Sequence, residues 1–198
     1  MKTDSREYEI LERAVRQIVH VEGLTCEIGV REGGGTKKIL DVLKSTGQNK
    51  IHVAIDPFGN IEYEHWETKK ERLDYTNTMK HTMLKNLYTY CSENSMEVLF
   101  FPLEDTEFFA RYANGVPVYN EYKYIYNTYA LVFFDGPHTS ALVQQEFDFF
   151  ANKIPVGGVI IFDDIDQYPH MTDLDTYIRN HNFNLLEKGQ CKISYIKH

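Results

Sequence analysis

The feature that most constrains the fold is a short apolar segment that runs into a glycine-rich loop and then into a helical pattern. The segment spans residues 24–28, and glycine occupies four of the seven positions of the loop, 29–35. Glycine permits a positive φ and has no Cβ, so a flat or phosphate-bearing ligand can lie against the backbone of such a loop. An ordinary tight turn before a helix that begins at Thr36 is the alternative interpretation.

A second strand pattern covers residues 50–55 and ends at Asp56, just before a proline. Two strands separated by one helix predict a βαβ unit, and therefore a parallel sheet that binds ligands at the carboxyl ends of its strands. Glu27, Gly29 and Asp56 are then expected in one crevice. Asp56 is well placed to accept both hydroxyls of a ribose, although an aspartate that only caps the next turn would look the same.

Two later strand patterns, residues 129–134 and 159–162, also end in acids. Asp135 follows the first of them, and Asp163 and Asp164 follow the second. If the two strands are neighbours, the three carboxylates converge at the mouths of both. They repel one another there unless a cation neutralises them, which predicts a metal site.

One more strand pattern, residues 96–101, lies between those at 50–55 and 129–134. It ends at a proline and precedes Leu103, Glu104 and Asp105. A ligand base lying over this edge would meet Leu103 with its face and an acid with its amino group. Acids at a helix start are also common because of the helix dipole, so both interpretations stay open.

The rest of the chain reads as scaffold. Helical spacing over residues 5–20 predicts an amphipathic helix, and two strands near 184–187 and 190–196 predict an antiparallel hairpin with a two-residue turn at Lys188-Gly189. Residues 60–72 form either a lid over the site or a solvated loop. The tyrosine-rich residues 112–129 form either an irregular connection or an added hairpin.

Composition limits the class of protein. The chain has 198 residues, of which 42% are hydrophobic, and this predicts one domain spanning residues 1–198. A net charge of −8 without a basic cluster argues against nucleic acid as a partner. Three widely spaced cysteines offer neither a disulfide framework nor a Cys-x-x-Cys metal site. With no apolar run long enough for a membrane span and no signal peptide, we expect a cytoplasmic protein without membrane contact.

The motifs gain weight from their order: Glu-x-Gly-x-x-x-Gly-Gly, then Asp-Pro-Phe, then Asp-Gly-x-His, then Gly-Gly-x-x-x-x-Asp-Asp. Over roughly residues 26–164 this order resembles the class I S-adenosylmethionine-dependent methyltransferases. It is most similar to the branch of metal-dependent sugar and small-molecule O-methyltransferases related to the macrocin type. The resemblance implies an α/β fold with a Rossmann-like, seven-stranded, mostly parallel sheet, helices on both faces and a C-terminal antiparallel hairpin.

The same resemblance implies a cofactor, S-adenosylmethionine, and a divalent metal. The residues that it assigns to the cofactor are Glu27, Gly29, Gly33, Gly34, Asp56, Leu103, Glu104, Asp105 and Asp135. It assigns the metal to Asp135, Asp163 and Asp164, with magnesium expected because all the ligands are oxygen. Gly35 departs from the pattern, since many relatives have a serine there.

A mechanism follows from these expectations. A divalent ion on the aspartates would bind two adjacent hydroxyls of a small molecule or sugar and lower the pKa of the hydroxyl that attacks the methyl group. With Asp135, His138 and His170 are the candidate catalytic residues, because either imidazole could take the proton or orient the substrate. A histidine hydrogen-bonded within its loop is the alternative for each.

Three other functions fit parts of the pattern. A nucleotide-cofactor oxidoreductase would use the glycine loop and Asp56 equally well, but it gives no role to the later aspartates. A hydroxylase-like relative would keep the fold and change the reaction. A non-catalytic cofactor-binding or assembly module would keep the fold and lose the reaction. O-methylation of a hydroxyl on a small molecule or sugar accounts for the most motifs.

Overall fold

The computed structural model describes residues 1, 5–66 and 69–198, with the backbone alone for 60, 61 and 63–66 and for 69–74. The helices are α1 (Tyr8–Gln17), α2 (Gly34–Ser45), α3 (Asn77–Asn94), α4 (Asp105–Tyr112), α5 (Ser140–Ala151) and α6 (His170–Asn180). The strands are β1 (Leu24–Ile28), β2 (His52–Ile55), β3 (Gly59–Trp66), β4 (Lys69–Tyr75), β5 (Val98–Phe101), β6 (Val116–Tyr119), β7 (Lys123–Tyr126), β8 (Tyr129–Phe134), β9 (Val159–Phe162), β10 (Phe183–Lys188) and β11 (Ile193–Lys197).

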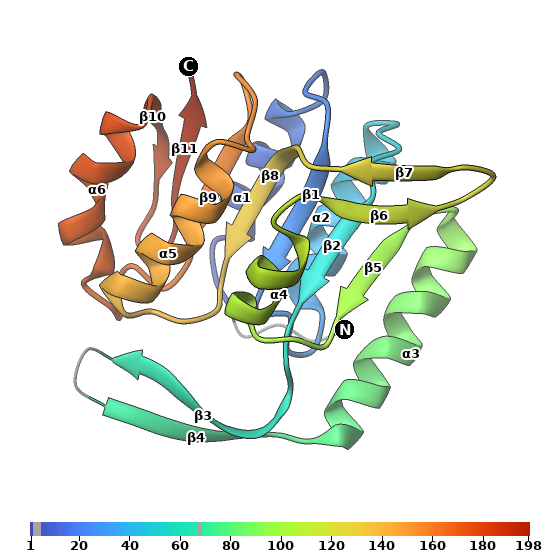
Figure 1. The fold of residues 1–198 in the computed structure, drawn as a ribbon, viewed down its shortest axis with the longest axis horizontal. Helices are drawn as coiled ribbons and strands as arrows, with labels where there is room; N and C mark the ends of the chain where they lie inside the picture. Colours follow the sequence, from blue (N-terminus) through green and yellow to red (C-terminus); the bar gives the residue numbers. More distant parts are fainter. Residues whose placement is uncertain (2–4, 67–68) are drawn as a thin grey trace.

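The centre of the fold is a seven-stranded sheet in the order β10-β11-β9-β8-β1-β2-β5 (Figure 1). The pairs β1–β2, β1–β8, β2–β5 and β8–β9 are parallel, whereas β11 is antiparallel to both β9 and β10. The chain builds outward from β1 to β5 and then returns to the other side of β1 with β8. Parallel sheets bind ligands at such a reversal of strand order. The predicted α/β fold with a mostly parallel sheet is therefore confirmed.

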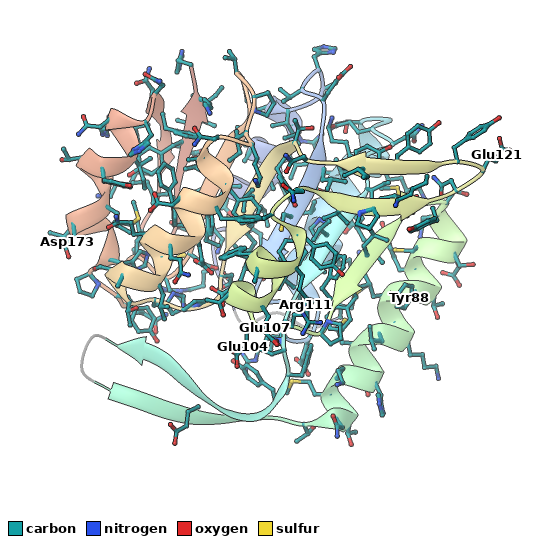
Figure 2. The ribbon with its side chains drawn as sticks, in the orientation of Figure 1. Tyr88, Glu104, Glu107, Arg111, Glu121 and Asp173 are labelled. Carbon is teal, nitrogen blue, oxygen red and sulfur yellow. The ribbon has the colours of Figure 1, made fainter. Side chains whose placement is uncertain are left out.

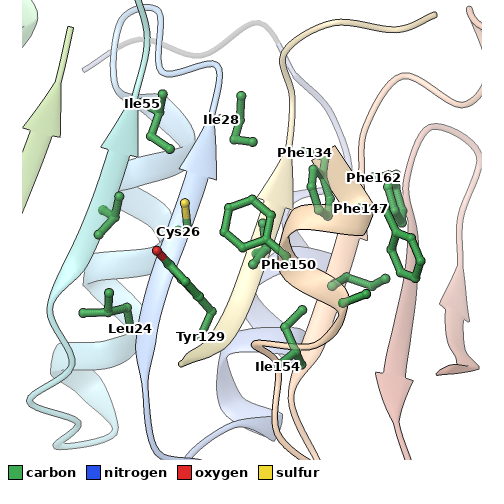
Figure 3. Close-up of a cluster of buried hydrophobic side chains, with 14 of the residues drawn as sticks. Leu24, Cys26, Ile28, Ile55, Tyr129, Phe134, Phe147, Phe150, Ile154 and Phe162 are labelled. Atoms are coloured by element: carbon green, nitrogen blue, oxygen red, sulfur yellow. The ribbon is translucent and has the colours of Figure 1, made fainter. Parts of the chain in front are cut away.

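Helices cover both faces of the sheet, and each face has its own apolar core. Phe134 and Phe162 face α4, α5 and α6; their rings stack 4.7 Å apart, and the ring of Phe134 also meets Phe150 of α5 (Figure 3). Leu131 and Phe133 of β8 point to the opposite face of the sheet, where they pack with residues of α1, α2 and α3. Every residue of β1, β2, β8 and β9 is buried. Burial on both faces explains why these strands read as continuous apolar runs in the sequence.

Two small hairpins leave the central sheet. The segment predicted as a lid or a loop forms the antiparallel pair β3–β4, which runs below the carboxyl ends of the central strands in Figure 1. The tyrosine-rich segment forms the antiparallel pair β6–β7, so the hairpin alternative holds for residues 112–129. In the described parts of the chain, none of the helices has the length and apolar character needed to cross a membrane.

The predicted C-terminal hairpin is present, but its turn is longer than expected. Lys188 pairs with Ile193, so residues 189–192 form a four-residue connection in place of the predicted two-residue turn. The longer turn is held from outside. The carboxylate of Glu7 accepts the amides of Gln190 at 3.0 Å and Cys191 at 2.8 Å. The side chain of Glu7 thus supplies the hydrogen-bond acceptors for backbone amides that a tight two-residue turn would pair within the hairpin.

Candidate functional site

The carboxyl ends of four neighbouring strands lie in one row, because the ladder hydrogen bonds continue one residue past each strand. The amide of Gly29 donates to Ile55 at 3.0 Å, and the amide of Asp135 donates to Ile28 at 2.9 Å. Asp163 likewise donates to the last residue of β8 at 3.0 Å. The glycine loop, the acid after β2 and the acids after β8 and β9 therefore share one edge, as the sequence predicted.

The glycine loop packs tightly against the loop after β8. Gly29 has φ +86°, and a Cβ there would lie 2.0 Å from the carbonyl oxygen of Asp135. Gly33 has φ +80° and precedes Gly34, the first residue of α2. Glycine at 29 thus lets the two loops touch, and the positive end of α2 faces the same edge.

Glu27 lies beneath this loop and is 1% exposed. The hydroxyl of Thr36 donates to its Oε2, and Nε2 of His52 lies 3.8 Å from the same oxygen. Burial raises the pKa of Glu27. A Cβ at position 35 would lie 2.1 Å from Oε1 of Glu27, so the absence of a side chain at Gly35 is a packing requirement.

Asp56 joins the end of β2 to the glycine loop. Its Oδ2 accepts the amides of Val30 at 2.9 Å and Arg31 at 2.8 Å, and its Oδ1 accepts the amide of Phe58 at 2.9 Å. Burial raises the pKa of Asp56, while the three amide donors oppose that rise. Asp56 is thus in the predicted crevice and orders the loop there; its contact with a ribose stays a prediction.

The residues at the start of α4 have separate environments. Glu104 is exposed and forms a capping box with Glu107, near Arg111 (Figure 2). Asp105 is partly buried beside the fully buried Glu146 of α5, and burial raises the pKa of both carboxyls. Leu103 packs partly buried against the core. Capping accounts for Glu104 without a ligand, and the adenine contact predicted for this segment is not tested by the geometry.

Three ligand atoms converge at the mouths of β8 and β9. Oxygens of Asp135 and Asp164 and a ring nitrogen of His138 lie within 4.8 Å of one another. Nε2 of His138 is 3.5 Å from Oδ2 of Asp164. Burial and the neighbouring carboxylate of Asp163 raise the pKa of Asp164 to about 6, and the same causes raise the pKa of Asp135 well above its ordinary value. Carboxylates this close repel one another, and a nearby positive charge would stabilise their charged forms.

Asp163 is adjacent in sequence but is turned to other partners. Its Oδ2 lies 2.5 Å from Nζ of Lys192 and accepts the hydroxyl of Ser5 at 2.5 Å. Its Oδ1 accepts the amide of Asp164 at 2.8 Å. The sequence predicted Asp163 as a metal ligand together with Asp135 and Asp164, whereas the structure brings His138 to those two and pairs Asp163 with a lysine.

The two candidate histidines differ in position. The ring of His138 stacks on Tyr168 with centroids 4.2 Å apart. His170 is the first residue of α6, is 1% exposed and lies 5.9 Å from His138 between ring centroids. His138 therefore belongs to the converging group, and His170 lies behind it.

Sequence reasoning missed Lys192 and Ser5. Lys192 lies in the C-terminal hairpin, and Ser5 precedes α1, so each reaches Asp163 only through the folded sheet. No local pattern marks either residue. The sole hint was that three aspartates at one edge need positive charge, and the sequence interpretation assigned all of that charge to a metal.

A cavity of about 440 Å³ adjoins the glycine loop between Met1, Glu32 and the first half of α3. None of the predicted site residues lines it. It lies between the glycine loop and α3, and we assign it no role.

The fold and the row of strand ends define the class: a class I methyltransferase domain. A family model described as a methyltransferase domain matches residues 26–165. The chain belongs to this methyltransferase family. No curated protein sequence matches the chain.

Solved structures with the same fold include several methyltransferases. The O-methyltransferase NovP superposes with a TM-score of 0.69 at 19% identity, over 96% of this chain and 78% of NovP. CalS11, a TDP-rhamnose 3'-O-methyltransferase of calicheamicin biosynthesis, gives 0.65 at 14% identity, over 94% of this chain and 77% of its own. SMU.1697c of Streptococcus mutans, determined in complex with SAH, gives 0.59 at 10% identity, over the full length of both chains. The resemblance drawn from the motifs is confirmed.

Proposed function

We propose that this protein transfers the methyl group of S-adenosylmethionine to a hydroxyl oxygen of a small molecule or sugar, with a divalent cation at the acceptor side. The observation that carries the proposal is the convergence of Asp135, His138 and Asp164 beside the glycine loop. A cofactor against the loop and an acceptor at the converging group would lie next to each other, because Gly29 and Asp135 are in contact. Methyl transfer needs that adjacency, since alignment of the two reactants supplies much of the rate.

The β1–β2 half of the edge fits the cofactor. The backbone of the loop from Gly29 to Gly34 and the start of α2 face the methionine portion, where a helix N-terminus favours a carboxylate. Asp56 already holds the loop through the amides of Val30 and Arg31, and its Oδ1, which also accepts the amide of Phe58, is the oxygen that we assign to the ribose. Leu103 and the start of α4 border the adenine.

The β8–β9 half fits a cation and an acceptor. Ligand atoms on one small divalent ion are about 3 to 4 Å apart, because each lies about 2.1 Å from the metal. The span of 4.8 Å within the converging group approaches that arrangement. When bound, the cation supplies a Lewis acid that lowers the pKa of an attached hydroxyl.

The relatives favour a hydroxyl on a sugar or a similar polyol. NovP is described as an O-methyltransferase and CalS11 as a TDP-rhamnose 3'-O-methyltransferase. An acceptor with two neighbouring hydroxyls would suit a cation that keeps open coordination positions. The methyltransferase family match gives no support to the oxidoreductase alternative.

Calorimetric binding of S-adenosylhomocysteine, followed by transfer of tritiated methyl from S-adenosylmethionine to a panel of nucleotide sugars and vicinal diols, tests the proposal. We expect binding of S-adenosylhomocysteine and labelling of at least one diol, which a chelator abolishes. The variant Asp164→Asn is expected to keep the binding and lose the labelling. Absence of S-adenosylhomocysteine binding, with binding of reduced nicotinamide cofactor instead, would contradict the proposal.

A further inference from the structure

One of the three aspartates at the carboxyl edge already has a cation of its own. Nζ of Lys192 and the hydroxyl of Ser5 both lie 2.5 Å from Oδ2 of Asp163. Lys192 is fully buried and Asp163 is 1% exposed. The ammonium also lies 5.2 Å from the ring centroid of Tyr8 and 5.4 Å from that of Phe133. Lysine and aspartate form a closed, neutral pair inside the protein.

A metal on Asp163 would compete with this pair. Coordination through Oδ2 would place two cations on one oxygen or leave the buried ammonium of Lys192 without its counter-charge, which is strongly unfavourable. The other oxygen, Oδ1, accepts the amide of Asp164 at 2.8 Å and so fixes the backbone at the next ligand. Asp163 therefore supports the site indirectly, by holding the backbone of Asp164 in place.

His138 occupies the place that Asp163 leaves. Its Nε2 lies 3.5 Å from Oδ2 of Asp164, and it joins Asp135 in the converging group. The ring is 7% exposed and stacks on Tyr168, which restricts its rotation. The following residue, Thr139, caps α5 and ends the loop that carries the imidazole.

We infer that Asp135, His138 and Asp164 hold the cation, with Asp163 outside the coordination shell, and that the cation is a first-row transition ion rather than magnesium. The reason is the donor set. Two carboxylates and one imidazole suit ions from Mn²⁺ to Zn²⁺, whereas Mg²⁺ prefers oxygen alone. This inference deepens the proposed methyl transfer and rests on it for its role, but metal binding can be measured separately.

The assignment gives each residue a distinct part. His138 is a metal ligand and is not the proton acceptor. Two carboxylates and a doubly charged ion make a neutral centre, because Lys192 has already neutralised Asp163. The Lys192–Asp163 pair neutralises the third aspartate outside the coordination shell, and Oδ1 of Asp163 holds the backbone at Asp164.

The test titrates the full-length, chelator-treated protein with Co²⁺ and with Mg²⁺, by calorimetry and by the visible absorption of Co²⁺. We expect Co²⁺ to bind about tenfold or more tightly than Mg²⁺. The variant His138→Ala should weaken Co²⁺ by about tenfold or more and change the absorption band, with a much smaller effect on Mg²⁺. The variant His20→Ala, which removes an exposed histidine, should leave both unchanged.

The double variant Asp163→Asn with Lys192→Met removes the pair without leaving a lone buried charge. It should bind Co²⁺ with an affinity within about threefold of the wild type, because it deletes no metal ligand in the proposed set and asparagine keeps an acceptor oxygen for the amide of Asp164. Wild-type Co²⁺ binding by His138→Ala, or a loss of Co²⁺ binding in the double variant, would overturn the inference. S-adenosylhomocysteine binding is measured on every variant without metal. Its absence in the wild type would count against the proposed function and not against the metal assignment.

Discussion

The two halves of the carboxyl edge differ in how the protein stabilises their acids. In the β1–β2 half, the chain itself supplies the donors. Glu27 accepts the hydroxyl of Thr36, and Asp56 accepts three backbone amides. This half is hydrogen-bonded before any ligand arrives, and its acids order the glycine loop.

In the β8–β9 half, the acids outnumber the cations. Asp135 and Asp164 lie together with raised pKa values, and the ammonium of Lys192 is taken up by Asp163. A raised pKa means that the negatively charged carboxylate is disfavoured at this edge. Either a proton or a metal cation would relieve the repulsion between the carboxylates. The contrast is that the protein itself supplies the donors in one half, whereas the other is the half in which we propose that a cation binds.

The largest expected effect comes from making the β8–β9 half more negative. The variant Lys192→Met leaves Asp163 buried and charged, which should lower the free energy of unfolding by about 3–5 kcal/mol. Urea denaturation at neutral pH measures this loss. The double variant Asp163→Asn with Lys192→Met should recover most of it. A single variant as stable as the wild type would show that this half tolerates the uncompensated charge.

The variant Asp56→Ala probes the preformed half. It removes the acceptor of three amides and should weaken S-adenosylhomocysteine binding about tenfold or more, because charge-assisted hydrogen bonds contribute about 1.5–3 kcal/mol each. Calorimetry measures the change. The variant Asp56→Asn, which keeps one acceptor oxygen, should have an affinity for S-adenosylhomocysteine between those of the wild type and Asp56→Ala. Wild-type affinity in Asp56→Ala would remove Asp56 from the cofactor side.

The variant Gly35→Ala tests how rigidly Glu27 is held in that half. The added Cβ would lie 2.1 Å from Oε1 of Glu27 in its present position. The carboxylate is tied to Thr36, so we expect a loss of about 1–3 kcal/mol in the free energy of unfolding. In a Glu27→Ala background the same substitution should cost far less. Equal losses in both backgrounds would mean that Glu27 moves freely.

Most of the fold could be predicted from the sequence, because period and order are local signals. Continuous apolar runs marked the strands buried on both faces, and acids or glycines marked where they end. Parallel strands bring their carboxyl ends to one edge. Asp135 and Asp164 therefore could be placed together although a helix separates them, and His138 followed from its place in the loop after β8.

The charge partners could not be predicted, because they depend on contacts across the whole chain. Lys192 meets Asp163 only through the antiparallel pairing of β11 with β9. The predicted length of the turn after Lys188 was wrong for a similar reason. Glu7 accepts the amide of Gln190 in that turn, although the two residues are 183 positions apart in the chain. Periodicity and turn chemistry do not record which distant side chain compensates a charge or a turn.

The smallest expected effect concerns Glu7, which lies behind the β8–β9 half but is held by amides, as Asp56 is. Hydrogen bonds from the amides of Gln190 and Cys191 lower the pKa of Glu7 from 4.5 to about 2. The folded state therefore favours the charged form, and this stabilisation is present above pH 4.5 and is lost as the pH falls toward 2. The variant Glu7→Gln should be about 1 kcal/mol less stable at pH 7, and the difference should shrink through that window. Thermal unfolding from pH 7 to pH 3 measures it, with Glu9→Gln as a control for net charge; a gap that does not depend on pH would contradict this role of Glu7.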